Sequence, residues 1–162
     1  MAWAKQKIMI FAVIVKGDNR MTFTEVHQDL FTVPKDYALV HCISADYALG
    51  AGIAKEFAKR GVKEVLKDSH KTPVGETAPT HATDWVMEFN LVTKEKYYYK
   101  PTYDTLCSAL VHMKLYCNLW KIKKLAMPRI GCGLDRLQWD KVKQIIEKVF
   151  ADTDVEIMVC SI

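Results

Sequence analysis

The chain has 162 residues and a formal net charge of +4, with 50% hydrophobic and 26% charged residues. This length and balance are typical of one soluble globular domain with a core of its own. The charge is compatible with a small anionic ligand, but it is too small and too scattered to indicate nucleic acid by itself. The five cysteines form no Cys-x-x-Cys pair, and neither they nor the five histidines have metal-ligand spacing. We therefore expect no metal and a reduced, cytoplasmic setting, or a nuclear one in a eukaryote.

An apolar run at residues 8–15 opens the chain. It follows two lysines, as in a short signal peptide, but no small-x-small cleavage site comes after it. The run is instead predicted to be a buried strand. The turn at Gly17-Asp-Asn would join it in a hairpin to a second strand at 21–27. We expect residues 1–20 to be a strand extension of a single domain spanning 1–162. No run approaches the length of a membrane span, so we expect no membrane partner.

Strand and helix patterns alternate along the rest of the chain. Apolar runs predict strands at residues 37–43, 85–93, 124–127 and 155–160. Helical spacing predicts helices at 51–60, 62–66 and 139–150, and a long helix, capped by Thr102, with its apolar face between Leu106 and Cys117. The polar segment 68–82 contains two prolines and a glycine and is predicted to be a loop. This alternation predicts an α/β layered domain whose sheet is mostly parallel in its second half.

Two glycine-containing turns each follow a predicted strand and open a predicted helix. They are Gly50-Ala-Gly-Ile-Ala54 and the turn with Gly131 and Gly133. Glycine permits positive φ and close approach of an anion, and amides at a helix N-terminus suit a phosphate. A lone Gly-x-Gly also occurs in plain tight turns, and the third glycine of the dinucleotide fingerprint is missing, which argues against a nicotinamide dehydrogenase. Two such turns at strand ends could grip a diphosphate from both sides, and Asp135 on the rim indicates chemistry there.

Six segments, in this order, carry a family resemblance. They are Asp29-Leu-Phe, His41-Cys-Ile-Ser44, Gly50-Ala-Gly-Ile-Ala54, Leu91-Val-Thr-Lys94, Lys100-Pro-Thr-Tyr103 and Pro128-Arg-Ile-Gly-Cys-Gly-Leu-Asp-Arg-Leu-Gln-Trp139. Together they resemble the macrodomain superfamily, in particular its terminal ADP-ribose protein glycohydrolase branch, over roughly residues 21 to 162. The resemblance implies a three-layer α/β/α sandwich with a central mixed sheet, which binds ADP-ribose in a crevice across the top of the sheet.

The resemblance also implies a role for each matching position. Asp29 would accept a hydrogen bond from the adenine amino group, the two glycine loops would enclose the diphosphate, and Ser44 would lie near the distal ribose. Gln28 departs from the glycine that is usual before this aspartate, which affects the adenine end. The implied ADP-ribose-binding residues are Asp29, Leu30, Ser44, Gly50, Ala51, Gly52, Ile53, Arg129, Ile130, Gly131, Cys132, Gly133, Leu134 and Ile162.

In this branch a lysine and an aspartate act together, and they match Lys94 and Asp135. An anomeric carbon is electrophilic once the ribose ring opens, and a lysine amine attacks it to form a Schiff-base adduct. The amine must be neutral, which burial or a nearby carboxylate that takes its proton can bring about. Without the resemblance, Lys94 would be a solvated lysine of a charged run. Cys132 is predicted to be a small residue between glycines rather than a nucleophile, and His41 a core histidine.

These features predict a hydrolase that removes mono-ADP-ribose from acidic side chains of proteins and deacylates O-acetyl-ADP-ribose. Its expected partners are ADP-ribosylated proteins and ADP-ribose or O-acetyl-ADP-ribose, with no cofactor and a monomeric state. A second hypothesis is cleavage of ADP-ribose from a DNA base, as in related antitoxin macrodomains, motivated by the positive charge and Tyr97–Tyr99. A third is a reader module that binds ADP-ribose without cutting it. Phosphatase action on ADP-ribose 1″-phosphate is a further alternative.

Overall fold

Six strands form one mixed sheet at the centre of the computed structural model, which describes residues 20–162. The strands are β1 (Thr22–His27), β2 (Ala38–Ser44), β3 (Thr77–Thr80), β4 (Glu88–Lys94), β5 (Lys124–Met127) and β6 (Glu156–Ser161), in the sheet order β1-β6-β5-β2-β4-β3. All neighbours are parallel except β3, which pairs antiparallel with β4 at one edge. The strand and hairpin predicted at residues 8–15 lie outside the described residues.

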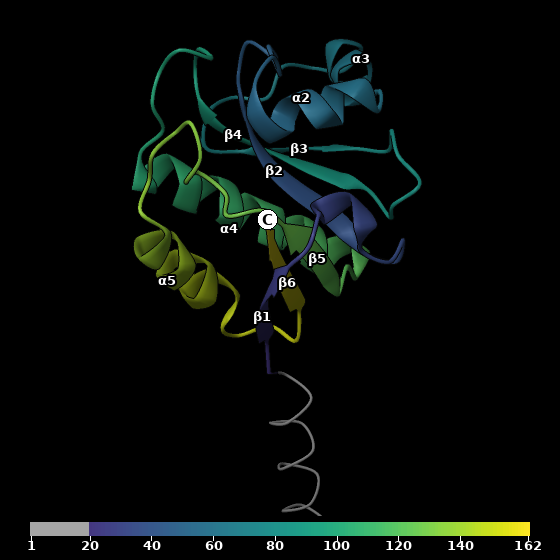
Figure 1. Cartoon of the computed structure of the whole chain (residues 1–162), viewed down its shortest axis with the longest axis vertical. Coiled ribbons are helices and arrows are strands. Elements are labelled where there is room, and N and C mark those ends of the chain that lie inside the picture. The colour runs from purple at the N-terminus through teal and green to yellow at the C-terminus, as the bar shows by residue number, and fades with distance from the viewer. Residues whose placement is uncertain (1–19) are drawn as a thin grey trace, which may run out of the picture.

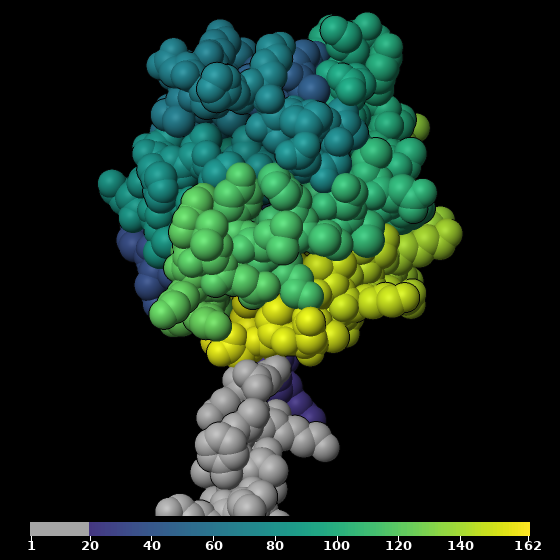
Figure 2. Space-filling model, turned by 180° about the vertical axis from the view of Figure 1, so that it is seen from behind, coloured from purple at the N-terminus to yellow at the C-terminus, as the bar shows by residue number. Residues whose placement is uncertain are grey.

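Helices cover both faces of this sheet. They are α2 (Gly52–Lys59), α3 (Val62–Lys67), α4 (Tyr103–Trp120) and α5 (Trp139–Phe150), with a short 3-10 helix, η1 (Leu30–Thr32). In Figure 1, α2 and α3 lie above β2, β3 and β4, and α4 and α5 lie on the other side of these strands, lower in the view. Figure 2 shows the opposite view, in which the green surface of α4 fills the middle of the face. The three-layer α/β/α sandwich is therefore confirmed. No helix within residues 20–162 is long and apolar enough to cross a membrane.

The sheet has a hydrophobic core on each face, because successive side chains of a strand point to opposite faces. On β2, Val40 packs with α4 and α5, whereas Leu39 and Ile43 pack with α2, α3 and η1. His41 lies on the α2 side, fully buried and stacked on the Phe57 ring at 3.7 Å between centroids. Its Nε2 lies 2.5 Å from Asn90 Oδ1. The prediction of a core histidine is confirmed.

The predicted loop at 68–82 is wrong in part, because it contains β3. This four-residue strand lies at the sheet edge, where Pro79 is tolerated because an edge strand uses only one side of its backbone for pairing. The strand predicted from residue 85 begins three residues later, at Glu88. The Thr102 cap is confirmed, since its hydroxyl accepts the backbone N–H of Thr105.

The parallel arrangement brings five chain segments to one edge of the sheet. Strands β1, β2, β4, β5 and β6 run in the same direction, so their carboxyl ends meet there. The residues at these ends, or within two positions after them, are Asp29, Ser44, Lys94, Pro128 and Ile162. In open α/β sheets, this edge is where ligands bind.

Candidate active site

A cleft of about 720 Å³ opens at the carboxyl ends of β2, β4 and β5. Its walls come from the loop that precedes α2 and from the loop between β5 and α5, and its floor comes from the strand ends. Of the residues predicted for the site, those that line the cleft are Ser44, Gly50, Ala51, Gly52, Ile53, Lys94, Arg129, Ile130, Gly131, Gly133, Leu134 and Asp135. The two glycine turns thus face each other across one cavity, as predicted.

Lys94 and Asp135 meet inside this cleft. Lys94 ends β4 and Asp135 lies in the β5–α5 loop, yet Lys94 Nζ is 2.6 Å from Asp135 Oδ1. Only 14% of the lysine side chain and 15% of the aspartate side chain are exposed. A charge-assisted hydrogen bond of this length between two mostly buried groups offers a direct path for a proton between amine and carboxylate. Both groups are at the surface of a cavity that can hold a substrate.

The glycines of the two loops differ in whether the backbone conformation requires a glycine. Gly52 and Gly131 have positive φ angles, of 59° and 74°, which side-chain-bearing residues rarely adopt. Gly133 has no positive φ, and a Cβ there would meet nothing within 4 Å. Leu134 Cδ1 lies 3.6 Å from where a Cβ of Gly52 would be, so Leu134 lies over Gly52 and the two loops approach each other. The glycine at 133 is thus one that folding does not require.

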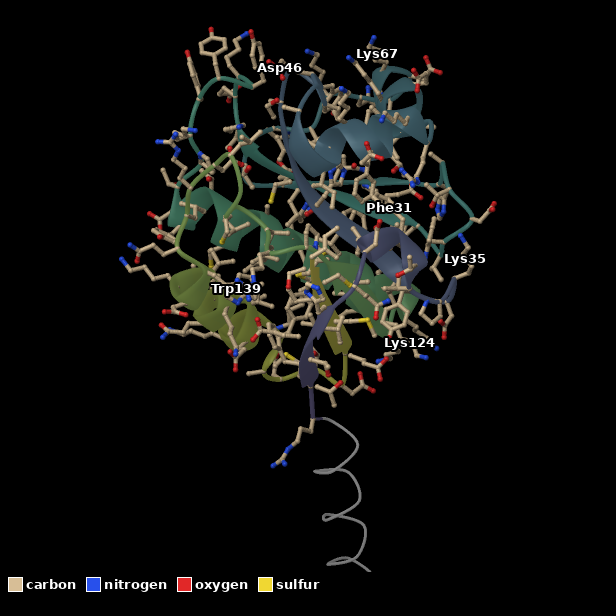
Figure 3. The ribbon with its side chains drawn as sticks, in the orientation of Figure 1. Phe31, Lys35, Asp46, Lys67, Lys124 and Trp139 are labelled. Atoms are coloured by element: carbon tan, nitrogen blue, oxygen red, sulfur yellow. The ribbon has the colours of Figure 1, made fainter. Side chains whose placement is uncertain are left out.

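The loop between β2 and the first glycine turn is held by Asp46, a residue that was not among those predicted for the site. Asp46 accepts hydrogen bonds from Ser44 Oγ at 2.5 Å, from the Ala48 N–H at 3.2 Å and from the Tyr97 N–H at 3.0 Å. It therefore ties the end of β2 to the segment that follows Lys94. Asp46 lies at the upper tip of the molecule in Figure 3. Only its position between two motifs could have drawn attention to it.

Further contacts fix the mouth of the cleft. Lys100 Nζ donates to the Leu134 carbonyl at 2.7 Å, which links the segment after β4 to the β5–α5 loop. Tyr97 and Tyr98 line the cleft, and each is 64% exposed. The side chain of Arg129 lies 3.8 Å from the Glu25 carboxylate and 5.6 Å from the Trp139 ring centroid. The motif Lys100-Pro-Thr-Tyr103 includes this lysine, but its sequence does not indicate the contact with Leu134.

Four predicted binding residues lie outside the cleft lining. Cys132 Sγ donates to the Ile130 carbonyl, and burial raises the pKa of its thiol, which suits a structural residue better than a nucleophile. Asp29 accepts from the Phe31 N–H and caps η1, while Leu30 is buried beside it. Ile162 follows β6 and is 87% exposed. Since His27 of β1 pairs with Ser161 of β6, Asp29 and Ile162 follow paired strand ends, beyond the cleft on the same edge.

Within residues 20–162, no three His, Cys, Asp or Glu side chains gather in a way that could hold a metal ion. The described site offers a lysine and a carboxylate in contact, inside a cavity walled by backbone amides.

Residues 40–146 match the Macro domain family model, in agreement with the sandwich and its glycine-walled cleft. The chain therefore belongs to the Macro domain family. This confirms the family predicted from the six motifs. The chain is 47% identical over 138 residues to the ADP-ribose glycohydrolase OARD1 of Bos taurus, covering 84% of this chain and 89% of that protein. Identity to OARD1 of Homo sapiens is 46%, with the same coverage.

Solved structures agree with this fold. The macrodomain of Mycobacterium tuberculosis DarG is 20% identical and superposes with a TM-score of 0.77, covering 87% of this chain and 98% of that one. Thermosipho africanus DarTG, solved in complex with ADP-ribose, superposes with a TM-score of 0.75 at 17% identity, covering 86% of this chain and 41% of that one.

Proposed function

We propose that this protein is an ADP-ribosyl hydrolase that binds ADP-ribose in the cleft and releases mono-ADP-ribose from glutamate and aspartate side chains of proteins. The observation that carries the proposal is the contact between Lys94 and Asp135 within the glycine-walled cavity. The identity to ADP-ribose glycohydrolases over most of the chain supports the same activity. A module that only read ADP-ribose would need the binding loops but not this lysine–aspartate pair.

The cleft suggests how the ligand lies. The diphosphate fits between the Gly50–Ile53 and Arg129–Leu134 loops, where backbone amides and the N-terminus of α2 attract an anion. Ala51 precedes α2 and gives no side-chain cap, so the first amides of that helix are not capped by it. The distal ribose then lies beside Ser44 with its C1″ atom at Lys94. The adenine extends toward Asp29 and Ile162, at the ends of β1 and β6.

The reaction then follows from the two side chains. Asp135 takes a proton from Lys94, the neutral Nζ attacks C1″, and the C1″–O bond breaks, so that the acceptor leaves as a carboxylate with the bonding electrons. The adduct nitrogen releases one proton to solvent. Its lone pair then opens the ribose to an iminium between C1″ and Nζ, while the proton on Asp135 passes to the ring oxygen. Asp135 next deprotonates a water that adds to C1″ and returns this proton to the nitrogen. As the C1″–N bond breaks, the new C1″ hydroxyl gives its proton back through Asp135 to the lysine amine, and the open aldehyde closes to ADP-ribose. The same cleft would admit O-acetyl-ADP-ribose, and we propose its deacylation as a second activity.

The test is the release of ADP-ribose from a glutamate-linked mono-ADP-ribosylated protein. Lys94→Ala and Asp135→Ala should each lower turnover at least about 100-fold, because each removes a group that handles a bond or a proton at C1″. Asp135→Ala should also accumulate ADP-ribose on Lys94, detectable by mass spectrometry of the peptide that contains it. The exposed Lys67→Ala serves as the control and should keep wild-type turnover. Full turnover by Lys94→Ala would falsify the mechanism, and binding of ADP-ribose by the wild type without any product would revive the reader hypothesis.

A further inference from the structure

One short segment of the chain holds the backbone beside both residues of the lysine–aspartate pair. It comprises residues 100–105, which connect β4 to the first turn of α4. Lys100 Nζ donates to the carbonyl of Leu134, the residue before the aspartate of the pair, at 2.7 Å. The Thr105 hydroxyl donates to the carbonyl of Thr93, the residue before the lysine of the pair, at 2.8 Å. The two ends of the segment thus reach equivalent points on two different strands and loops.

A carbonyl that is held in place determines where the next residue lies. The peptide unit is planar, so the carbonyl of one residue and the N–H and Cα of the next move together. Holding the Leu134 carbonyl therefore fixes the point from which the Asp135 side chain extends, and holding the Thr93 carbonyl does the same for Lys94. The contact of 2.6 Å between Nζ and Oδ1 is in this way set from a common support.

The tip of the β5–α5 loop, residues 133–136, depends on this support. Among residues 20–162, the hydrogen bonds that reach the tip from outside its loop come from Lys94, to Asp135, and from Lys100. Arg136, directly after the aspartate, has a φ of 63°, a left-handed conformation that is unfavourable for a residue with a side chain. Without Lys100, hydrogen bonding from the rest of the described protein would hold this tip only through the reacting pair itself.

We propose that Lys100 is a positioning residue of the reaction, which holds Asp135 at the distance from Lys94 that proton transfer requires. The inference rests on the proposed function, in which Asp135 takes and returns protons at Nζ and C1″. Lys100 also lines the cleft and makes no ion pair among residues 20–162, so the competing role is that of a cation that attracts the diphosphate. A binding cation would act on KM, whereas a positioning residue acts on kcat.

The experiment replaces Lys100 by methionine, whose side chain has a similar length but cannot donate. In the release of ADP-ribose from the glutamate-linked protein, kcat should fall about 10- to 30-fold, because a small misplacement of a reacting group is costly, while KM changes less than about threefold. Lys100→Arg can still donate to the carbonyl and should recover most of kcat. The matched control is Lys96→Met, an exposed lysine of the same connection that does not line the cleft, and it should keep wild-type kcat.

The other end of the segment provides an independent check that changes no charge. Thr105→Val removes the donor to the Thr93 carbonyl and should lower kcat about fivefold, whereas Thr105→Ser keeps the hydroxyl and should retain it. Because both ends act on one distance, Lys100→Met combined with Thr105→Val should lose less than the product of the two separate losses. Losses that multiply would mean that the two ends act independently, which would overturn the common support.

Stability measurements keep folding apart from positioning. The hydrogen bond of Lys100 is exposed and water can replace it, so Lys100→Met should unfold at the same urea concentration as wild type. Wild-type kcat in this variant, or a raised KM with unchanged kcat, would overturn the inference and leave the proposed function in place. A loss of kcat that Lys100→Arg did not reduce would also overturn it. If wild type released no ADP-ribose, the proposed function would fail and the inference with it.

Discussion

Asp46 shows how a single carboxylate can prepare a site without touching the substrate. It fixes the hydroxyl of Ser44 as a donor to itself, so the lone pairs of that hydroxyl remain available as acceptors at the cleft. It also fixes the backbone after Lys94 through the Tyr97 N–H. Hydrogen bonds formed before the substrate arrives reduce the ordering required on binding.

We expect Asp46→Ala to lower kcat/KM for ADP-ribose release roughly tenfold, because a misplacement of the order of an ångström is costly in a positioned site. Asp46→Asn keeps one acceptor oxygen and should recover part of the loss. Steady-state kinetics of both variants, with the exposed Asp84→Ala as control, test the claim. Equal activity of Asp46→Ala and wild type would remove Asp46 from the site.

The two glycines of the β5–α5 loop allow folding and binding to be separated. At Gly131 a Cβ would lie 2.9 Å from Leu137 Cδ1 at a φ of 74°, so Gly131→Ala should lower the free energy of unfolding by about 1–2 kcal/mol. At Gly133 nothing lies within 4 Å of a Cβ and φ is not positive, so Gly133→Ala should fold normally. If the diphosphate approaches this backbone, Gly133→Ala should nevertheless weaken ADP-ribose binding roughly tenfold. Urea unfolding and calorimetric titration measure the two effects, and unchanged affinity in Gly133→Ala would contradict the placement of the diphosphate.

At the scale of elements, the N-terminus of α4 is tied to the strand that carries Lys94. Thr102 and Thr105 form a capping box, and the Thr105 hydroxyl also donates to the Thr93 carbonyl at 2.8 Å. Thr102→Ala should lower the free energy of unfolding by about 1 kcal/mol because the Thr105 N–H loses its acceptor. Thr102→Ser keeps the hydroxyl and is the matched control. Equal stability of the two variants in urea would mean that water replaces the cap.

Most elements were predictable because their cores repeat at regular spacing. Helix α4 has its buried residues on the face that the sequence indicated, with Leu106, Leu110, Met113 and Cys117 all buried. Strand β3 was not predictable, because its four residues include a proline and are short of an apolar pattern. The start of β4 was misplaced because the apolar residues Trp85 and Met87 are buried although they precede the strand. The buried carboxylate of Glu88 accepts hydrogen bonds from Thr80, Ala82 and Thr83, and such partners cannot be found from local sequence.

At the scale of the whole molecule, the site exists only because parallel strands converge. Lys94 and Asp135 are 41 residues apart, and no local pattern indicates that they touch. The sequence predicted two glycine turns at strand ends from local chemistry, but the pairing of Lys94 with Asp135 came from the family resemblance. The hydrogen bonds of Asp46 could not be predicted, because they depend on how the end of β2 meets the segment after β4.

The stability of the whole fold should depend on pH through one buried histidine, His41, on the α2 face of the sheet. The side-chain amide of Asn90 donates to Ala78 and Thr80, so its oxygen must accept from His41 Nε2, and His41 Nδ1 is buried without a hydrogen-bond partner. A proton on Nδ1 would place an unpaired charge in the core, and burial lowers the pKa of His41 from 6.5 to about 4. Between those values the unfolded chain binds a proton that the folded chain does not, so stability falls as pH falls through this window and levels off below it.

At pH 5 this difference corresponds to a loss of about 2 kcal/mol relative to pH 7, from about 1.4 kcal/mol per pH unit below the unfolded pKa. The loss precedes that from carboxylates such as Asp46 and Glu25, whose pKa values are lowered in the fold and whose contribution disappears only below their ordinary values of 3.8 and 4.5. Urea unfolding at pH 7 and pH 5 measures it. His41→Gln, whose amide can still donate to Asn90, should lose most of the difference between the two pH values, whereas the exposed His81→Gln should retain it. If His41→Gln kept the full difference in the free energy of unfolding between pH 7 and pH 5, this difference would arise from other histidines. The buried ring of His41 would then be protonated or solvated in the fold at pH 5.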